Sequence, residues 1–302
     1  DHVDGISFHP YYAFGNMGAD GLLGTLDNMK AYLDKTTPGN NVKYCITEHA
    51  TGWHGTNTTD ADGNTVTTHT AFDTAETSSL KAALLGSSFI SQALKRDYID
   101  TTMYYHGTYG HIWGRMNNNN GDMLISAVGD TYSFLTDEWK NTVLDTTVSV
   151  EDGVLNNYEE DFAAVAVRGT ANELKLILTN AAAYKDVDTT FNLPAKYTLV
   201  NEKVFTAPNI YSSVYNKNCE NIASAVSTDC NVENFSTYKV PSKSIVVLTL
   251  KTEDGKSELS ENFDYSNTEV TADSVKDVAV NANGAKWVTS SVNNGEVEPD
   301  YE

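Results

Sequence analysis

The sequence predicts an α/β region of alternating strands and helices, followed by an all-β region of antiparallel strands. Within the first 105 residues, three short apolar runs alternate with two stretches that have apolar residues at helical spacing. Such alternation is typical of consecutive βα units and a parallel sheet. Beyond about residue 142, short apolar runs separated by turn residues favour an antiparallel β-sandwich. We therefore predict an α/β domain at 1–141, a β-sandwich at 142–251, and an acidic linker or the start of a further module at 252–302.

The α/β region has five expected elements. The first helix places leucines and a methionine at helical spacing, and the second carries a stripe crowded with small residues. The polar segment 55–69 is expected to be a surface loop over a strand end. In chain order, we expect a strand at 3–9, a helix at 21–33, a strand at 42–47, a helix at 74–95 and a strand at 98–105.

The all-β region begins after a helical stretch near 132–139. Its runs alternate apolar and polar residues or are continuously apolar, and turn residues separate them. A lone strand is also expected at 286–288 in the acidic tail. The strands of the sandwich are expected at 162–167, 174–179, 188–193, 197–200 and 244–250.

Composition narrows the class of ligand. The 302 residues carry a formal net charge of -21, and 40% of them are hydrophobic. Such acidity argues against nucleic acid and against an anionic membrane surface, and it fits a neutral ligand. No apolar run approaches the length of a membrane span. No signal peptide is visible before the first strand, so we expect this N-terminus to come from truncation or processing.

Three cysteines allow one disulfide. Cys45 lies in an apolar run and is expected to be a buried thiol. Cys219 and Cys230 lie in a polar stretch and could close a loop disulfide in a secreted protein, or they could remain unpaired. No zinc-binding spacing is present.

The candidate chemistry lies at the ends of the expected strands. Glu48 follows strand 42–47, and His9 and Tyr11 follow strand 3–9. Reactive side chains at the C-terminal ends of parallel strands are how a (β/α) barrel builds an active site. A carboxylate held by hydrogen-bond donors suits a nucleophile that attacks the anomeric carbon of a sugar. Aromatic residues near these strand ends, Trp53 and Tyr105 among them, could stack on sugar rings.

Each residue also has a simpler interpretation. A lone glutamate after a strand is often a solvated loop residue, and His9 could be a structural hydrogen-bond partner. Tyr105 could be an ordinary sheet aromatic. A metal site made from histidines 49, 54 and 69 is disfavoured by their loose spacing, so we predict neither metal nor cofactor.

These motifs resemble those of a known group of enzymes. The run 6–12, Ile-Ser-Phe-His-Pro-Tyr-Tyr, resembles the sixth barrel strand of clan A glycoside hydrolases, closest to the family 51 α-L-arabinofuranosidases. Ile46-Thr47-Glu48, followed by Trp53-His54, is similar to the seventh strand of that family. The helix that begins near Ala75 and the sandwich that ends at 240–248 are also similar. The resemblance covers about residues 1–250 and implies the last three βα units of a partial (β/α)8 barrel, followed by an antiparallel β-sandwich.

The resemblance implies a retaining glycosidase that acts on a plant-type or algal polysaccharide or oligosaccharide. Glu48 corresponds to the nucleophile, and the implied substrate-binding residues are His9, Tyr11, Trp53, Tyr105 and His106. Two departures leave the sugar open, with xylans, galactans and algal polysaccharides as alternatives. Thr47 and His49 flank Glu48 where the family usually has an acidic residue and Trp, and His106 lies near the position of an expected Gln.

The resemblance begins at the sixth strand, so the general acid/base glutamate of the clan is not matched. The Asn-Glu pairs at 172–173 and 201–202 fall in the expected sandwich, out of reach of Glu48. We therefore predict that this chain alone is inactive and that its partner is the missing N-terminal part of the same barrel. A secreted or cell-surface bacterial location is expected. The alternatives are a non-catalytic carbohydrate-binding or adhesion protein and a metal-dependent hydrolase.

Overall fold

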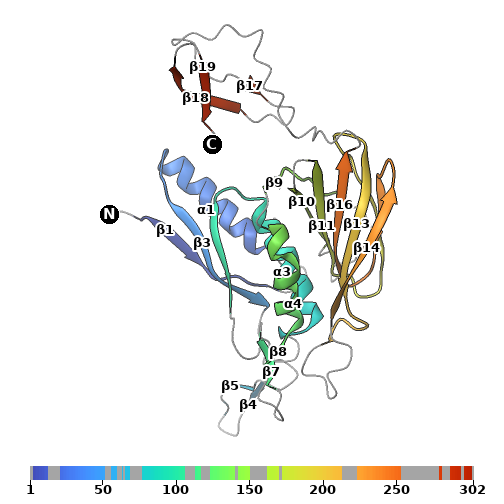
Figure 1. Cartoon of the computed structure of the whole chain (residues 1–302). Coiled ribbons are helices and arrows are strands. Elements are labelled where there is room, and N and C mark those ends of the chain that lie inside the picture. The colour runs from blue at the N-terminus through green and yellow to red at the C-terminus, as the bar shows by residue number, and fades with distance from the viewer. Residues whose placement is uncertain are drawn as a thin grey trace.

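The fold is a mixed one, rich in sheet and with few helices. Figure 1 shows helices α3 and α4 lying between a sheet that contains β1 and β3 and a second sheet that contains β10, β11, β16, β13 and β14. The computed structural model describes residues 3–12, 21–51, 56–59, 63, 65–68, 77–105, 113–116, 123–139, 142–149, 162–169, 172–212, 223–252, 279–280, 286–293 and 296–300.

The first sheet is parallel, as the βα pattern predicts. Strand β3 (Lys43–Thr51) pairs with β1 (Gly5–Phe8) and β2 (Tyr11–Tyr12) on one side and with β6 (Ile99–Tyr104) on the other. The strand expected at 42–47 was predicted to end too early, because β3 continues to Thr51. Its extra residues pair with β2 and β6, so Glu48 lies inside a strand rather than in the loop after it.

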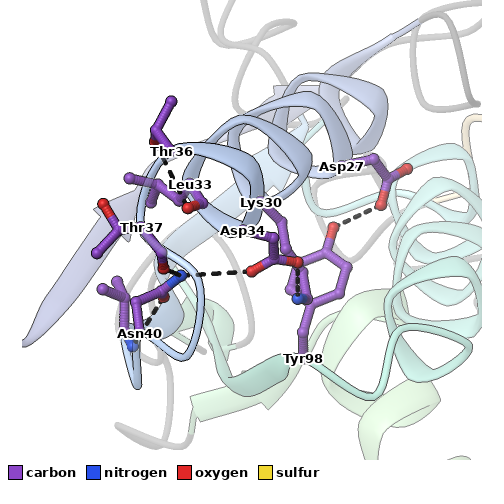
Figure 2. A network of polar contacts seen from close by, with 9 residues as sticks. Asp27, Lys30, Leu33, Asp34, Thr36, Thr37, Asn40 and Tyr98 are labelled. Carbon is purple, nitrogen blue, oxygen red and sulfur yellow. Dashed lines mark hydrogen bonds and ion pairs between the residues drawn. The ribbon is translucent and has the colours of Figure 1, made fainter.

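Helix α1 (Leu22–Thr36) covers one face of this sheet. Its buried Leu23 and Leu26 belong to a core cluster with Tyr44 and Ile46 of β3. A polar network attaches α1 to the chain before β6: Arg96 donates two hydrogen bonds to Asp27, and the Tyr98 hydroxyl donates a third. Figure 2 shows the Tyr98 contact and the polar contacts around Lys30, Asp34 and Asn40 that close the end of the helix.

Helix α3 (Leu80–Leu94) is buried on almost every side. It contacts β3 and β6 of the parallel sheet, and also β10, β11 and β16 of the antiparallel sheet. Small residues such as Ala83 and Ser87 let the antiparallel sheet approach the helix closely, and the Ser87 hydroxyl is 2.8 Å from the hydroxyl of Thr179 in β11. The small residues of the predicted stripe therefore face the antiparallel sheet, whereas the larger Leu85 and Phe89 share a core with the parallel sheet. Helix α4 (Ala127–Trp139) packs beside α3.

The second sheet is antiparallel and has six strands, in the order β14-β13-β16-β11-β10-β9. Both of its faces are apolar. Val165, Ile177 and Val247 share a core with α3 and α4, whereas Leu176 and Leu248 share a core with residues of β15 and of the segments beside it. This explains the continuous apolar run near 244–250. The strands are β9 (Val143–Leu144), β10 (Phe162–Arg168), β11 (Glu173–Asn180), β13 (Tyr197–Thr206), β14 (Ser224–Val232) and β16 (Ser244–Thr252).

The remaining strands form small sheets. β12 (Val187–Thr190) and β15 (Thr237–Val240) pair beside the second core, and the sequence pattern missed both β14 and β15. The segment expected as a loop at 55–69 instead contains a hairpin of β4 (Thr56–Thr59) and β5 (Thr65–Thr68). The other short strands are β7 (Trp113–Met116), β8 (Met123–Ile125), β17 (Ala279–Val280), β18 (Lys286–Asn293), which contains the strand expected at 286–288, and β19 (Glu296–Asp300).

Two cysteines are described. Cys45 is a half-buried free thiol in β3, and Cys230 is a free thiol whose Sγ donates a hydrogen bond to the carbonyl of Thr228. Cys219, the other half of the disulfide considered above, lies outside the described residues. None of the described helices is long and apolar enough to cross a membrane.

Candidate active site

The candidate site lies on the face of the parallel sheet opposite the core of α1 and α3. Side chains two residues apart in a strand point to the same face. Ser7, His9 and Tyr11 follow this spacing through β1 and β2, and all three are exposed. Ile6 and Phe8 alternate with them and pack against the core around Tyr44 and Ile46. One row of polar side chains therefore borders β3 along its length.

An irregularity in β3 brings Glu48 to the same face. Ile46 pairs with Thr102 and His49 pairs with Tyr104, so Thr47 and Glu48 together lie opposite one residue of β6. This is a β-bulge, which breaks the alternation of faces and re-aims side chains, often beside active sites. Ile46 and His49, three residues apart, consequently both face the helices. Thr47 and Glu48 both contact the polar row of β1 and β2.

Glu48 is held by both predicted partners. The Tyr11 hydroxyl donates a hydrogen bond to Oε2 of Glu48 over 2.6 Å, and Nδ1 of His9 lies 3.6 Å from the same oxygen. Burial, together with the hydrogen bond to Glu48, raises the pKa of Tyr11 to about 12, so the phenol stays a proton donor at neutral pH. The Glu48 side chain is 32% exposed, which leaves it accessible to a ligand.

His9 is itself fixed by hydroxyl groups. Its Nε2 is 2.8 Å from Oγ1 of Thr47 and 3.3 Å from Oγ of Ser7, and the two hydroxyls also share a hydrogen bond. Thr47 was expected only as a departure from the family pattern, and Ser7 was not predicted to belong to the site. The spacing of Ser7, His9 and Tyr11 by two could have identified Ser7, because it predicts a shared face.

Aromatic side chains border this group. The rings of Tyr11 and Tyr105 meet edge to face with centroids 6.4 Å apart, and both residues are partly exposed. The structure therefore brings Tyr105 of the segment after β6 to the predicted site. Trp53 and His106, the other predicted substrate contacts, lie outside the described residues.

His49 belongs to the opposite side of the sheet. Its side chain is fully buried, with its ring centroid 5.0 Å from that of Phe89 and 5.5 Å from that of Tyr104. Burial lowers the pKa of His49 to about 4, which keeps the imidazole neutral at pH 7. His49 therefore cannot join Glu48, and among the described residues no group of His, Cys, Asp or Glu is arranged to hold a metal ion.

The arrangement can present an oriented carboxylate to a neutral ligand. The Tyr11 hydroxyl donates a hydrogen bond to this carboxylate, His9 lies next to it, and a partly exposed aromatic pair lies beside it. Within the described part of the chain, the polar partners of Glu48 are Tyr11 and His9, and neither is a carboxylate. Glu173 and Glu202, the two alternatives weighed above, lie on β11 and β13 of the antiparallel sheet.

Comparisons with known proteins identify the fold. No protein-family model and no curated protein match this sequence. Among solved structures, the α-L-arabinofuranosidase of Thermotoga maritima in its arabinose complex has a TM-score of 0.57 at 13% identity and covers 82% of this chain and 53% of its own. The family 51 arabinofuranosidase of Xanthomonas axonopodis pv. citri has a TM-score of 0.51 at 18% identity, with the same coverage.

A third similar structure belongs to another family. The family 86 β-porphyranase of Bacteroides plebeius has a TM-score of 0.50 at 16% identity and covers 84% of this chain and 42% of its own. This chain spans 37% to 53% of the family 51 enzymes that it matches. The resemblance seen in the sequence motifs is thus confirmed at the level of structure. The chain corresponds to about half or less of the length of the clan A glycoside hydrolases of family 51, the α-L-arabinofuranosidases, and over that part it has their fold.

Proposed function

We propose that this chain carries the nucleophile of a retaining glycoside hydrolase and that Glu48 is this nucleophile. The observation that carries the proposal is the bulge in β3, which turns Glu48 toward Tyr11 and His9. Displacement at an anomeric carbon needs an ionised carboxylate that is accessible and held still. Hydrogen bonds to the charged form of a carboxylate favour that form.

In the proposed reaction, a Glu48 oxygen attacks the anomeric carbon and the bond from that carbon to the leaving oxygen breaks. A general acid protonates the leaving oxygen, and a covalent glycosyl ester of Glu48 forms. The same acid, now a base, removes a proton from water, which attacks the anomeric carbon and releases Glu48 and the sugar with retained configuration. The Tyr11 hydroxyl donates its hydrogen bond to the Glu48 carboxylate before the attack, and again when hydrolysis restores the negative charge of Glu48.

The general acid is proposed to come from outside this chain. Retaining enzymes hold their two carboxyl groups about 5 Å apart, and the described partners of Glu48 include no carboxylate. We propose that the parallel strands are the last three of a (β/α)8 barrel at 1–141 and that a β-sandwich at 142–251 buttresses it. The burial of α3 between both sheets supports such buttressing. The isolated chain is then expected to be inactive.

The substrate is proposed to be a plant-type or algal polysaccharide or oligosaccharide. The edge-to-face pair of Tyr11 and Tyr105 supports a carbohydrate, because aromatic faces stack on the apolar faces of sugar rings. The similar structures include arabinofuranosidases and a β-porphyranase, which is why both plant and algal glycans are proposed. Such polymers are met outside the cell, so a secreted or surface location in a bacterium is proposed.

The test uses the whole protein that contains this chain and a panel of aryl glycosides that includes the α-L-arabinofuranoside. Glu48→Ala is expected to lower kcat/KM by at least about 10³-fold, because the covalent step is lost. Sodium azide should restore turnover and give a glycosyl azide of inverted configuration. Glu233→Ala, at an exposed position after β14, is the matched control and should not change the rate. Unchanged hydrolysis by the Glu48→Ala variant would contradict the assignment of Glu48 as the nucleophile.

A further inference from the structure

Among the described residues, the hydroxyl of Thr47 is the polar group nearest to the ring of His9 on the side away from Glu48. Its Oγ1 is 2.8 Å from Nε2 of His9, whereas Nδ1 of the same ring faces Oε2 of Glu48 at 3.6 Å. We propose that Thr47 is a positioning residue that fixes the orientation and the tautomer of His9, so that Nδ1 carries the proton and faces the carboxylate. This inference deepens the proposed function of Glu48 and rests on it for its effect on the rate.

The bulge lets Glu48 share this face with Thr47. In a regular strand, consecutive side chains point to opposite faces. In β3, Thr47 and Glu48 point to one face, and they lie opposite a single residue of β6. Two neighbouring side chains of one strand therefore approach the two nitrogens of one imidazole. Without the bulge, regular alternation from the buried Ile46 would keep Thr47 on this face and turn Glu48 to the helices, so only one of the two contacts would remain.

The positions of the protons follow from which of these groups can donate a hydrogen bond and which can accept one. A neutral imidazole has one N–H donor and one acceptor nitrogen, and an ionised carboxylate can only accept. Nδ1 faces Glu48, so the stable arrangement places the proton on Nδ1, and Nε2 must then accept a hydrogen bond. Thr47 can donate to Nε2, and Ser7 can donate in turn to Oγ1 of Thr47, with which it shares a hydrogen bond.

This arrangement gives His9 a defined role. The tautomer of a histidine is set by the hydrogen bond that its other nitrogen makes. With the proton on Nδ1, a neutral His9 turns the positive end of its N–H dipole to the charged carboxylate. Without the hydroxyl of residue 47, Ser7 is the remaining donor to Nε2 among the described residues, its oxygen is 3.3 Å away, and the second tautomer becomes populated.

The experiment combines ¹⁵N NMR spectroscopy of the histidine rings with kinetics, both on the whole protein that contains this chain. The histidine rings are labelled with ¹⁵N, and His9→Gln identifies the signals of His9. Wild type is expected to show the Nδ1–H tautomer, and the isosteric Thr47→Val should show a mixture with Nε2–H. Thr47→Ser, which keeps the hydroxyl, and Ser7→Ala, which keeps Thr47, should both retain the wild-type tautomer.

The kinetic arm measures kcat/KM on the aryl glycoside that wild type cleaves. Thr47→Val is expected to lower kcat/KM about 10-fold, the lower end of the loss seen when groups that orient metal-binding histidines are removed, and Thr47→Ser should restore it. An unchanged tautomer in Thr47→Val overturns the inference, whatever the rate. If Thr47→Val shifts the tautomer but hydrolysis survives Glu48→Ala, the inference about Thr47 stands and the proposed nucleophile is wrong. The two failures are therefore distinguishable.

Discussion

The phenol of Tyr11 donates a hydrogen bond to Oε2 of Glu48, with 2.6 Å between the two oxygens, across two neighbouring strands. The residues are 37 positions apart, and the parallel pairing of Tyr11 with Ala50 brings them together. The contact therefore depends on the register of β2 against β3. It is also the shortest described polar contact of Glu48.

Removing this hydroxyl should weaken the proposed reaction without disturbing the ring. A hydrogen bond to a charged group contributes about 1.5 kcal/mol or more. Tyr11→Phe keeps the edge-to-face contact with Tyr105 and is expected to lower kcat/KM about 10-fold, measured on the aryl glycoside that the whole protein cleaves. Tyr32→Phe, at an exposed tyrosine of α1, is the control and should keep the wild-type rate. Equal rates for both variants would contradict the role of Tyr11.

His49 predicts how stability depends on pH. Its pKa is about 4 in the folded protein, below the ordinary histidine value of 6.5, so the unfolded state binds the proton first as the pH falls. The contribution of neutral His49 to stability is complete above pH 6.5 and is lost as the pH falls toward 4. Relative to His49→Phe, wild type should lose up to about 1.4 kcal/mol of unfolding free energy per pH unit in this window. Denaturant unfolding at pH 7 and pH 5 measures the difference, and parallel losses in both proteins would exclude it.

A buried ion pair joins α4 to the antiparallel sheet. Glu138 is 2% exposed, and its carboxylate lies 2.6 Å from Nζ of Lys175 and 3.4 Å from Nζ of Lys203. Lys175→Met should lower the free energy of unfolding by about 3 kcal/mol, because a buried carboxylate loses its near partner. Lys203→Met removes the longer and more exposed contact and should cost less than about 1 kcal/mol. Chemical denaturation compares the two variants, and equal losses would show that the buried pair has no special weight.

The position of α3 between two sheets predicts an asymmetric response to larger side chains. Ala83 is 1% exposed and belongs to the core that α3 shares with the antiparallel sheet. Ala83→Leu is expected to lower the free energy of unfolding by about 1–3 kcal/mol, because a filled core resists added volume. Gln92→Leu, on a partly exposed position of the same helix, should change it by less than about 0.5 kcal/mol. Thermal unfolding of both variants checks this, and similar melting temperatures would argue against the tight packing of α3.

Much of the first sheet could be predicted from periodicity. The strands near residues 6, 45 and 101 and the two helices between them appear where apolar spacing placed them. Strand β14 was missed, because it lies at the edge of its sheet and most of its residues are exposed, so its apolar pattern is weak. The hairpin at 55–69 was missed because its strands are made almost wholly of polar residues. Backbone pairing, rather than apolar alternation, forms both.

The sequence by itself determined the order of the main strands and helices, the acidic character of the chain and the choice of candidate site residues, because these depend on local spacing and side-chain chemistry. Only the tertiary structure decided which way those residues face. Regular alternation from the buried Ile46 would turn Glu48 to the helices and His49 to the open face. The bulge reverses both outcomes. It lies between the residues of β3 that pair with β1 and those that pair with β2, where the register against β6 shifts. Such pairing between distant segments leaves no mark in the local pattern of β3.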